Sequence, residues 1–409
     1  MRDSHDESFT QRQPAGAPRK GASPNTALPD TVKRQVARFP VAARAPIRKL
    51  IRSKPQAAEL VEAFPALLYA LAMGHAGTAS GQNALHQLDR GLRLRNIAQT
   101  LGVPMWMRRL PPETFESGLS KLPASDTFSR RIPARLPQHP AQAANWLQAV
   151  RFANSAAGDE FALWIARQRA ACHKPNVSSR LAILAAFVWH SRHRTDRTCD
   201  LIWTSWRPEM ALETAVCAAQ SWFNRILATL YLSQPAALSP WLNPGRVDGY
   251  EFIPLTCAAE LFMEARAMNN CTDQYAMTLV TGRSRLFSVR RDGRRQATLE
   301  ISPHHRERQV LAIAQLKSHS NRPAPLEVWQ AAYHWMGQQQ HLFDGAIENG
   351  ERRLVPDKDI WHSHLKAYRS ATEGAPWLPA DPTDRAMTTI QVGHATLAHD
   401  CAIRSWLFA

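Results

Sequence analysis

The sequence lacks the compact motifs that identify many enzymes. It contains no glycine-rich phosphate loop, no dinucleotide fingerprint, no nucleophile elbow, no zinc-protease helix and no set of protein-kinase motifs. Its six cysteines are widely spaced and include no CxxC pair. In a chain of 409 residues, this spacing favours free thiols in a reducing compartment over a disulfide framework or a structural zinc site. We therefore expect neither a metal site nor a cofactor.

Long hydrophobic runs are also missing. No segment approaches the roughly 18 apolar residues needed to cross a bilayer, and the longest candidate, residues 181–189, is followed by His190 and a basic tripeptide. The first residues carry acids where a signal peptide has positive charge and then an apolar run. The sequence predicts a soluble, cytoplasmic protein that does not contact a membrane.

Acidic residues are scarce. The chain has 34 acids against 50 lysines and arginines, a net charge of +16, and residues 1–54 alone hold twelve cations against four acids, a net charge of +8. Such a basic balance fits a polyanionic partner, DNA or RNA, although a solvated basic tail has the same composition. We predict that residues 1–54 form a disordered basic arm, with a short helix in its second half. Its candidate nucleic-acid contacts are Arg44, Arg48, Lys49 and Arg52.

Residues 55–250 are predicted to form a helical region rich in tryptophan. Apolar residues recur there at helical spacing, and Pro65 is expected to kink or divide one of the helices. The 13 tryptophans have no fixed period, which argues against a solenoid repeat. The proline- and glycine-rich segment 235–249 is expected to separate this region from the next one along the chain.

Residues 251–340 are predicted to be a small α+β core. A helix over 254–268, with Pro254 in its first turn, should precede an antiparallel meander of three strands. The turn at Asp292-Gly293 allows two registers. We prefer a three-residue loop, which pairs Arg290 with Arg294 and Leu286 with Thr298. It gathers five apolar side chains on one face, which a helix over 325–340 should cover: Phe287, Val289, Ala297, Leu299 and Ile301.

The opposite face of the meander is predicted to be polar. It should carry Ser288, Arg290, Thr298 and Glu300, with Gln315 and Lys317 from the third strand. In one interpretation, Glu300 acts as a general base or binds a cation while Arg290 holds an anionic group. The alternative is a structural ion pair between these two residues. Gln315 and Asn321 fit either interpretation.

Two further features leave alternatives open. Cys271, at the end of the predicted helix, is a candidate nucleophile or ligand, and otherwise a small thiol at the helix–sheet junction. Arg291, Arg294 and Arg295 at the hairpin tip could bind phosphates, or could form a solvated tip.

Residues 341–409 are predicted to be an extension with a helix near 360–368 and two strands within 388–408. The fold class expected for the whole chain is α+β, with a mostly helical N-terminal half.

The central stretch resembles the PcfJ-like proteins of bacterial plasmids and other mobile elements. Nine residues follow the order of that family's pattern: Met268, Cys271, Tyr275, Ser288, Arg290, Thr298, Glu300, Gln315 and Asn321. The resemblance covers less than a fifth of the chain and departs at Asn270, where the family has histidine, and at Ser318, where it has glycine. The family has no settled activity, so the resemblance implies a mobile-element accessory protein, with a protein partner from a conjugation or mobile-element system, but no reaction.

Three hypotheses arise from these patterns. The first is a nucleic-acid-binding accessory protein that uses the basic arm and the hairpin tip. The second is an enzyme with a pocket around Glu300, Arg290 and Cys271, in which Tyr275, Thr298, Gln315 and Asn321 contact the substrate. The third is a protein–protein scaffold that uses the tryptophan-rich region.

Overall fold

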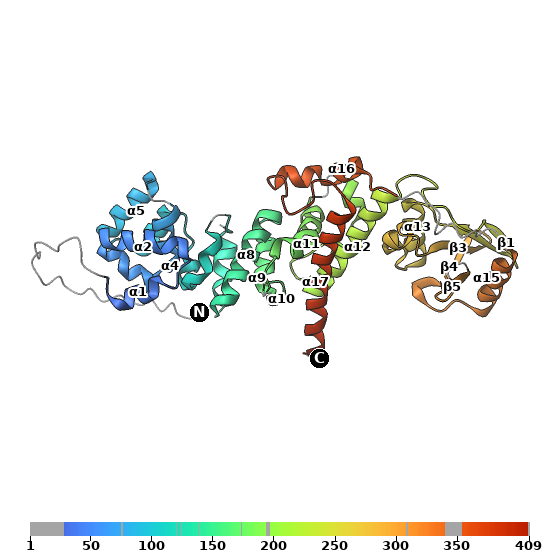
Figure 1. The fold of residues 1–409 in the computed structure, drawn as a ribbon, viewed down its shortest axis with the longest axis horizontal. Helices are drawn as coiled ribbons and strands as arrows, with labels where there is room; N and C mark the ends of the chain where they lie inside the picture. Colours follow the sequence, from blue (N-terminus) through green and yellow to red (C-terminus); the bar gives the residue numbers. More distant parts are fainter. Residues whose placement is uncertain are drawn as a thin grey trace, which may run out of the picture. The chain divides into compact units, whose positions relative to one another are not determined.

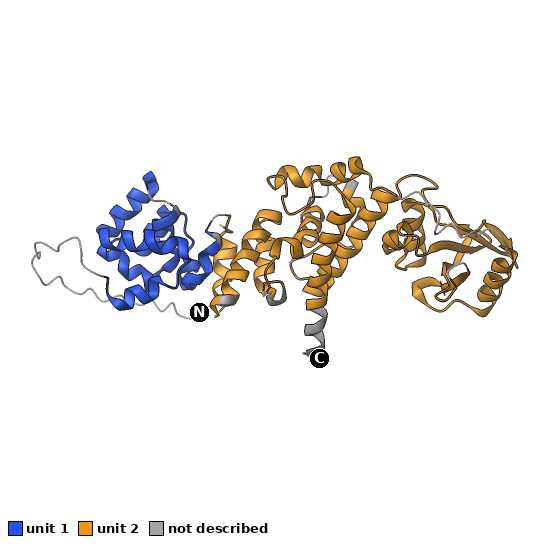
Figure 2. Ribbon diagram, viewed as in Figure 1, with its two compact units in different colours: residues 1–119 blue, residues 120–409 orange. Residues whose placement is uncertain are grey.

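Helices and one antiparallel sheet make up the fold (Figure 1). The computed structural model describes residues 28–74, 77–119, 121–123, 125–137, 139–172, 174–193, 197–307, 310–339 and 354–407. The chain divides into two compact units, residues 1–119 and 120–409 (Figure 2). A helical N-terminal half followed by a sheet is an α+β arrangement, and the predicted fold class is confirmed. Among the described helices, none is long and apolar enough to cross a membrane.

Unit 1 consists of short helices. They are α1 (Asp30–Val36), α2 (Val41–Ser53), α3 (Leu60–Ala63), α4 (Pro65–Tyr69), α5 (Ala79–Asp89) and α6 (Leu94–Thr100), with 3-10 turns at Pro55–Glu59, Met105–Arg109 and Pro112–Ser117 and a π-helical turn at Ala70–Gly74. Pro65 opens α4 and divides it from α3, as predicted, because proline has no amide hydrogen for the preceding turn. Phe39, Phe64 and Phe115 are fully buried at the centre of the unit.

The predicted disordered arm needs correction. Residues 30–53 form α1 and α2, and Val36, Phe39 and Ile47 are fully buried in unit 1. The apolar residues of this segment therefore supply enough buried surface to order it, although the segment is strongly basic. The arm's first 27 residues lie outside the described part of the chain.

Eight of the described helices of unit 2 lie outside the region of the sheet, and one of them is buried along most of its length. They are α7 (Asp126–Arg131), α8 (Pro140–Ala157), α9 (Asp159–Arg167), α10 (Arg169–Cys172), α11 (Val177–Arg192), α12 (Leu212–Tyr231), α16 (Lys358–Ala371) and α17 (Asp384–Leu407), with 3-10 turns at Pro133–Arg135 and Arg197–Leu201. Helix α11 packs against α8, α12 and α17 (Figure 1). Because it has neighbours on several sides, α11 is apolar around most of its circumference.

Helix α17 overturns the prediction of two strands within residues 388–408. Its buried residues Met387, Ile390, His394 and Leu397 recur every three or four positions, which is the helical period and not the alternation of a strand. The helix packs along α11 and α12, although it is separated from them by more than 150 residues of sequence.

The sheet has five antiparallel strands in the order β1-β2-β3-β4-β5, two more than predicted. The strands are β1 (Gly245–Val247), β2 (Tyr250–Pro254), β3 (Arg285–Arg291), β4 (Arg294–Pro303) and β5 (Leu311–Lys317). Pro254 ends β2 and does not open a helix, and α13 (Ala258–Met268) begins after a capping box between Cys257 and Glu260. The expected separator at 235–249 contains β1, so the boundary placed at 250/251 cuts through a hairpin.

The register of the β3–β4 hairpin differs from the prediction, although the buried face is the predicted one. Asp292 and Gly293 both have positive φ, so they form a two-residue turn that pairs Arg291 with Arg294. A bulge between Val289 and Arg290 then shifts the register, and Leu286 pairs with Glu300. Without the bulge, a two-residue turn would place apolar and polar side chains on the same face of the hairpin. The bulge returns the apolar side chains to one face. The five predicted apolar residues are fully buried: Phe287, Val289, Ala297, Leu299 and Ile301.

Helix α15 (Leu326–Gln338) covers the apolar face of the sheet, as predicted. Trp335 stacks on Phe252 of β2, with ring centroids 4.6 Å apart, and meets Phe287 of β3 edge-on at 5.0 Å. The other face of the sheet is contacted by α13, and the 3-10 turn Thr272–Gln274 follows that helix; α14 (Ala276–Val280) comes next and packs on α12. Polar groups of α13 and this turn therefore come next to the polar side chains of β4 and β5.

Candidate functional site

A small polar cavity lies on the face of the sheet opposite α15. It is lined by the turn that follows α13, by strands β3 to β5 and by the 3-10 turn His319–Asn321. Six of the seven residues predicted for the pocket line it: Cys271, Tyr275, Thr298, Glu300, Gln315 and Asn321. Asn270, Thr272, Leu286 and Lys317 complete the lining. Its volume is about 20 Å³, which is room for about one water molecule.

Glu300 is the carboxylate of the cavity. Gln315 Nε2 donates a hydrogen bond of 2.5 Å to Glu300 Oε2, and the phenol of Tyr275 donates one of 3.1 Å to the same oxygen. Gln315 also donates to the oxygen of Tyr275. Burial, together with the neighbouring charge of Glu300, raises the pKa of Tyr275 well above its usual value. The phenol is therefore a neutral donor that holds the carboxylate in place.

A second network begins at Glu264, a residue that sequence reasoning missed. Glu264 is fully buried on α13 and accepts hydrogen bonds from Arg295 Nε at 2.7 Å and from Thr298 Oγ1 at 2.9 Å. Thr298 in turn accepts a bond of 2.9 Å from Asn270 Nδ2. The position of Glu264 in the sequence could have indicated this role. It lies one turn after Leu261 on the apolar stripe of α13, and a charged group on a buried stripe requires a partner.

Asn270 supports the turn that carries Cys271. Its side-chain oxygen accepts from the backbone N–H of Thr272 at 3.1 Å and from the hydroxyl of the same residue, so its hydrogen bonds stabilise the turn after α13. Cys271 is half-buried, and no histidine lines the cavity among the residues that the structure describes. The arrangement has no Cys–His pair of the kind that activates a thiol.

Arg290 does not belong to the cavity. Its Nε donates to Ser288 Oγ at 3.1 Å, and it pairs across the hairpin with Arg295. Glu300 pairs with Leu286, four residues away from Arg290 along β3. The predicted pocket of Glu300 with Arg290, and the alternative ion pair between them, are therefore both wrong, because the register places the two side chains at different points along the hairpin.

The hairpin arginines separate into structural and exposed ones. Arg295 pairs with Glu264, which corrects its assignment as a nucleic-acid contact. Arg291 is exposed and lies over the ring of Tyr250, with its Cζ 5.3 Å from the centroid, and Arg294 is exposed. Arg285 is buried and donates to backbone carbonyl groups. The sequence does not distinguish this structural arginine from the exposed arginines around it. Two of the three predicted tip arginines thus stay available to a partner.

The basic residues of α2 lie on its solvent side. Helix α2 buries Ala43, Ile47 and Ile51, and Arg48, Lys49 and Arg52 are exposed. None of these three cations forms an ion pair with an acid in the described part of the chain. The fourth predicted contact, Arg44, is half-buried and donates to the carbonyl oxygen of Phe39 at 2.8 Å, so it supports the loop before the helix.

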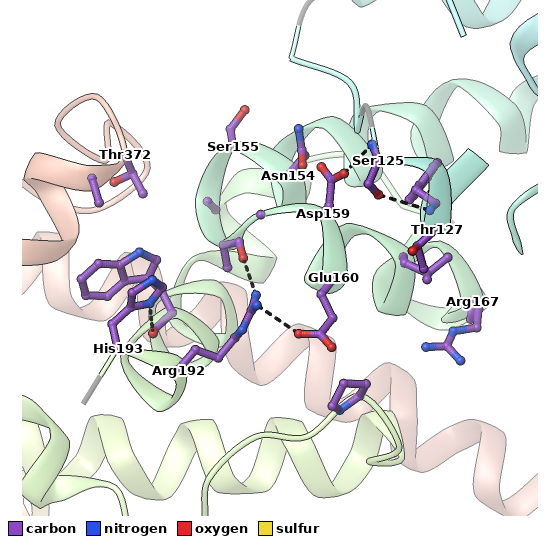
Figure 3. Close-up of a pocket in the computed structure, with 18 of the residues that line it drawn as sticks. Ser125, Thr127, Asn154, Ser155, Asp159, Glu160, Arg167, Arg192, His193 and Thr372 are labelled. Carbon is purple, nitrogen blue, oxygen red and sulfur yellow. Dashed lines mark hydrogen bonds and ion pairs between the residues drawn. The ribbon is translucent and has the colours of Figure 1, made fainter. Parts of the chain in front are cut away.

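Elsewhere in unit 2, a cleft of about 780 Å³ opens beside α9 and the end of α11 (Figure 3). No residue predicted for a site lines it. Arg192 donates to the carbonyl of Ala157 at 3.2 Å and pairs with Glu160 at 3.1 Å, and Asp159 accepts from the backbone N–H of Ser125 (Figure 3). The central charges of the cleft are therefore satisfied by one another and by the backbone.

The described residues contain no group of three or more His, Cys, Asp or Glu side chains that could hold a metal ion. Comparisons of the chain with protein-family models, with curated proteins and with solved structures give no match. The functional argument therefore rests on the geometry and charge of the chain itself.

Proposed function

We propose that the protein binds nucleic acid through the exposed basic face of α2, formed by Arg48, Lys49 and Arg52 and called here the α2 basic face. The observation that carries this proposal is the grouping of three exposed cations on one face of a single helix in unit 1. Three other cations of unit 1 pair with acids: Lys33 with Asp30, Arg38 with Glu113 and Lys54 with Asp89. The three cations of the α2 basic face have no such partner among the residues described.

The α2 basic face suits a phosphate backbone. Arg48 and Arg52 are four residues apart on one helix, so their side chains project from the same side, and Lys49 lies next to them. Cations that neutralise phosphates release counterions, which gives a strong dependence of affinity on salt. The exposed Arg291 and Arg294 in unit 2 offer a second contact of the same kind. The described residues show no aromatic ladder on α2, so the proposal concerns phosphates and not base recognition.

The test is a fluorescence-anisotropy titration of labelled DNA and RNA against the whole protein at several salt concentrations. The triple variant Arg48→Gln, Lys49→Gln, Arg52→Gln should bind more weakly, and its slope of log affinity against log salt should be smaller by about 2 to 3, because each phosphate that is no longer neutralised removes about 0.9. A matched control removes three exposed arginines of unit 2: Arg207→Gln, Arg322→Gln and Arg385→Gln. Equal weakening in both triple variants would show that net charge, and not the α2 basic face, determines binding.

The cellular setting that we propose comes from the resemblance to PcfJ-like proteins. It is a cytoplasmic accessory role in a plasmid or other mobile element, with a protein partner from the same system. The cation excess supports an assembly on nucleic acid. Pull-down of one defined partner from a host that carries the element, and no pull-down from a host without it, is the expected result.

A second candidate function is catalysis at the polar cavity, and the convergence of six predicted side chains favours it. In this proposal Glu300 acts as a base, positioned by Tyr275 and Gln315. The variant Glu300→Gln should fold with the thermal midpoint of the wild type and lose the phenotype of the protein in its host. A fully active Glu300→Gln variant would leave the network with a structural role only.

A further inference from the structure

An open groove of about 830 Å³ lies in unit 2 between α12 and the end of α13. Trp203, in the loop that precedes α12, lines one side of it, and Asp273, in the turn after α13, lines another. Its volume lies within the range of small-molecule sites, about 300 to 1,000 Å³. We call it the Trp203 groove. Only Asn270 lines both this groove and the small polar cavity around Glu300.

Two guanidinium groups lie against the indole of Trp203. Arg225 Cζ lies 4.2 Å and Arg266 Cζ 5.0 Å from the ring centroid. Arg225 is nearly inaccessible and is fixed from two sides, because its Nε donates to the carbonyl of Leu201 at 2.7 Å and its Nη1 pairs with Asp273. The positive charge of Arg225 is therefore fixed beside the groove, while its side chain offers almost no surface for direct contact with a ligand.

The charges of the groove do not balance. Its charged lining consists of Arg225, Arg266 and Asp273, so two cations face one acid. Asp273 is used by Arg225, and Arg266 is exposed with no acidic partner in the described part of the chain. Burial lowers the pKa of Arg225; Asp273 opposes this change, and the charge of Arg266 adds to it. An anion bound to the exposed Arg266 would offset the repulsion between the two guanidinium groups.

The remaining lining mixes polar and apolar side chains, and the groove is large enough for a ligand bigger than a bare ion. Along α12 the groove presents Thr214, Cys217 and Ser221, and Gln274 Nε2 donates to Ser221 Oγ at 3.3 Å. Hydroxyl and amide groups at this spacing can bond the hydroxyls and ring edges of a sugar or a base. The lining thus combines cations for an anionic group with neutral donors and acceptors for the rest of the ligand.

We infer that the Trp203 groove binds a phosphorylated ligand of about the size of a mononucleotide, with its phosphate on the exposed guanidinium of Arg266 and the fixed charge of Arg225 behind it. Arginine suits this role because its planar fork of donors matches phosphate oxygens. The phosphate has two possible sources, a free nucleotide or one nucleotide of a strand.

The test is calorimetric titration of the whole protein with adenosine monophosphate, inorganic phosphate and adenosine. The monophosphate should bind more tightly than phosphate, and adenosine should not bind. Arg266→Gln should weaken monophosphate binding at least tenfold, because this exposed residue supplies one of the two guanidinium groups. The matched control Arg207→Gln removes an exposed arginine that does not line the groove and should leave the affinity unchanged. No binding of the monophosphate, or equal affinity in Arg266→Gln and the wild type, would overturn the inference.

A second readout does not depend on calorimetry. Cys217 is an exposed thiol that lines the groove. Bound monophosphate should slow its reaction with a thiol reagent in the wild type but not in Arg266→Gln. Protection that is equal in both proteins would place the ligand elsewhere.

The two sources of phosphate, and the two proposals, can be separated with the same proteins. If the ligand is a free nucleotide, an oligonucleotide will not displace the monophosphate from the groove. If it belongs to a strand, the oligonucleotide will displace it, and Arg266→Gln will weaken strand binding. The α2 triple variant should bind the monophosphate as the wild type does. Loss of monophosphate binding in that variant would contradict the groove, whereas unchanged DNA binding by it would contradict the α2 basic face alone.

Discussion

Arg295 of β4 and Glu264 of α13 form an ion pair with Nε and Oε2 2.7 Å apart, and the carboxylate is fully buried. The pair joins the helix to the sheet directly beside the polar cavity. Thr298 donates to the other oxygen of the same carboxylate. A buried carboxylate with these partners is stable only while they are present, because its charge has no access to water.

Arg295→Gln should therefore lower the free energy of unfolding by about 2 to 3 kcal/mol, since Glu264 loses a charged hydrogen-bond donor. Urea denaturation followed by far-UV circular dichroism measures this change. Arg294→Gln is the matched control: Arg294 is an exposed neighbour, and its loss should change the stability by less than about 0.5 kcal/mol. Adding Glu264→Gln to Arg295→Gln should restore part of the loss. No recovery in the double variant would mean that the pair is not the source of the effect.

His394 should make the protein less stable in weak acid. Burial lowers its folded-state pKa from 6.5 to about 4, and Nε2 donates to the carbonyl of Val216 at 3.1 Å. Because the folded pKa lies below the unfolded one, the unfolded state binds more protons between these values. Stability is then fully present above about pH 6.5 and falls as the pH decreases towards 4.

From pH 7 to pH 5 this single histidine should cost about 2 kcal/mol of stability. The measurement compares urea denaturation of the wild type with that of His394→Gln, whose side chain does not titrate in this range. The variant should lack this part of the pH dependence. His305→Gln changes an exposed histidine and should keep the wild-type dependence. The same slope in the wild type and in His394→Gln would contradict the assignment.

Gly393 allows α17 to approach α11 closely. A Cβ atom at this position would lie 2.4 Å from the backbone oxygen of Ser179, which belongs to α11 and cannot easily move. Gly393→Ala should lower the thermal midpoint and cost about 1 to 3 kcal/mol. Gly337→Ala, in helix α15, meets no atom within 4 Å and should be neutral or stabilise by about 0.5 to 1 kcal/mol. If the two alanine variants have equal stability, α17 does not pack this closely on α11.

Cysteine reactivity should differ strongly along the chain. Cys217 is exposed, whereas Cys172 is buried and its pKa is raised to about 12 by that burial. Because only the thiolate reacts, a disulfide reagent at pH 8 should modify Cys217 rapidly and Cys172 only after unfolding. The fast phase should disappear in Cys217→Ser. Its persistence in that variant would show that another thiol is the reactive one.

The five apolar residues of the β3–β4 hairpin show what local sequence can specify. Their alternation determines which face of each strand is buried, since a misplaced face would expose all of them. The register is less strongly specified, because turn length and bulge position compensate for each other. The prediction placed the bulge next to the turn, and the structure has it between Val289 and Arg290.

The cavity was partly predictable for the same reason. Thr298, Glu300 and Gln315 share a face because they alternate with buried apolar residues, and Tyr275 was placed by the resemblance. Arg290 also has the alternation expected for the polar face, but it lies too far along β3 from Glu300 to line the cavity. Alternation determines a face but not a distance along it, which depends on the bulge and on the pairing of two strands.

By itself, the sequence determined the α+β class, the buried face of the hairpin and the amphipathic character of α2, because each depends on a short-range period of apolar residues. Only the tertiary structure decided that Arg295 pairs with Glu264, that Arg225 pairs with Asp273 and that α17 packs on α11. These contacts join residues that are distant along the chain. A buried charge selects its partner by proximity in the folded state, and no local pattern records that proximity.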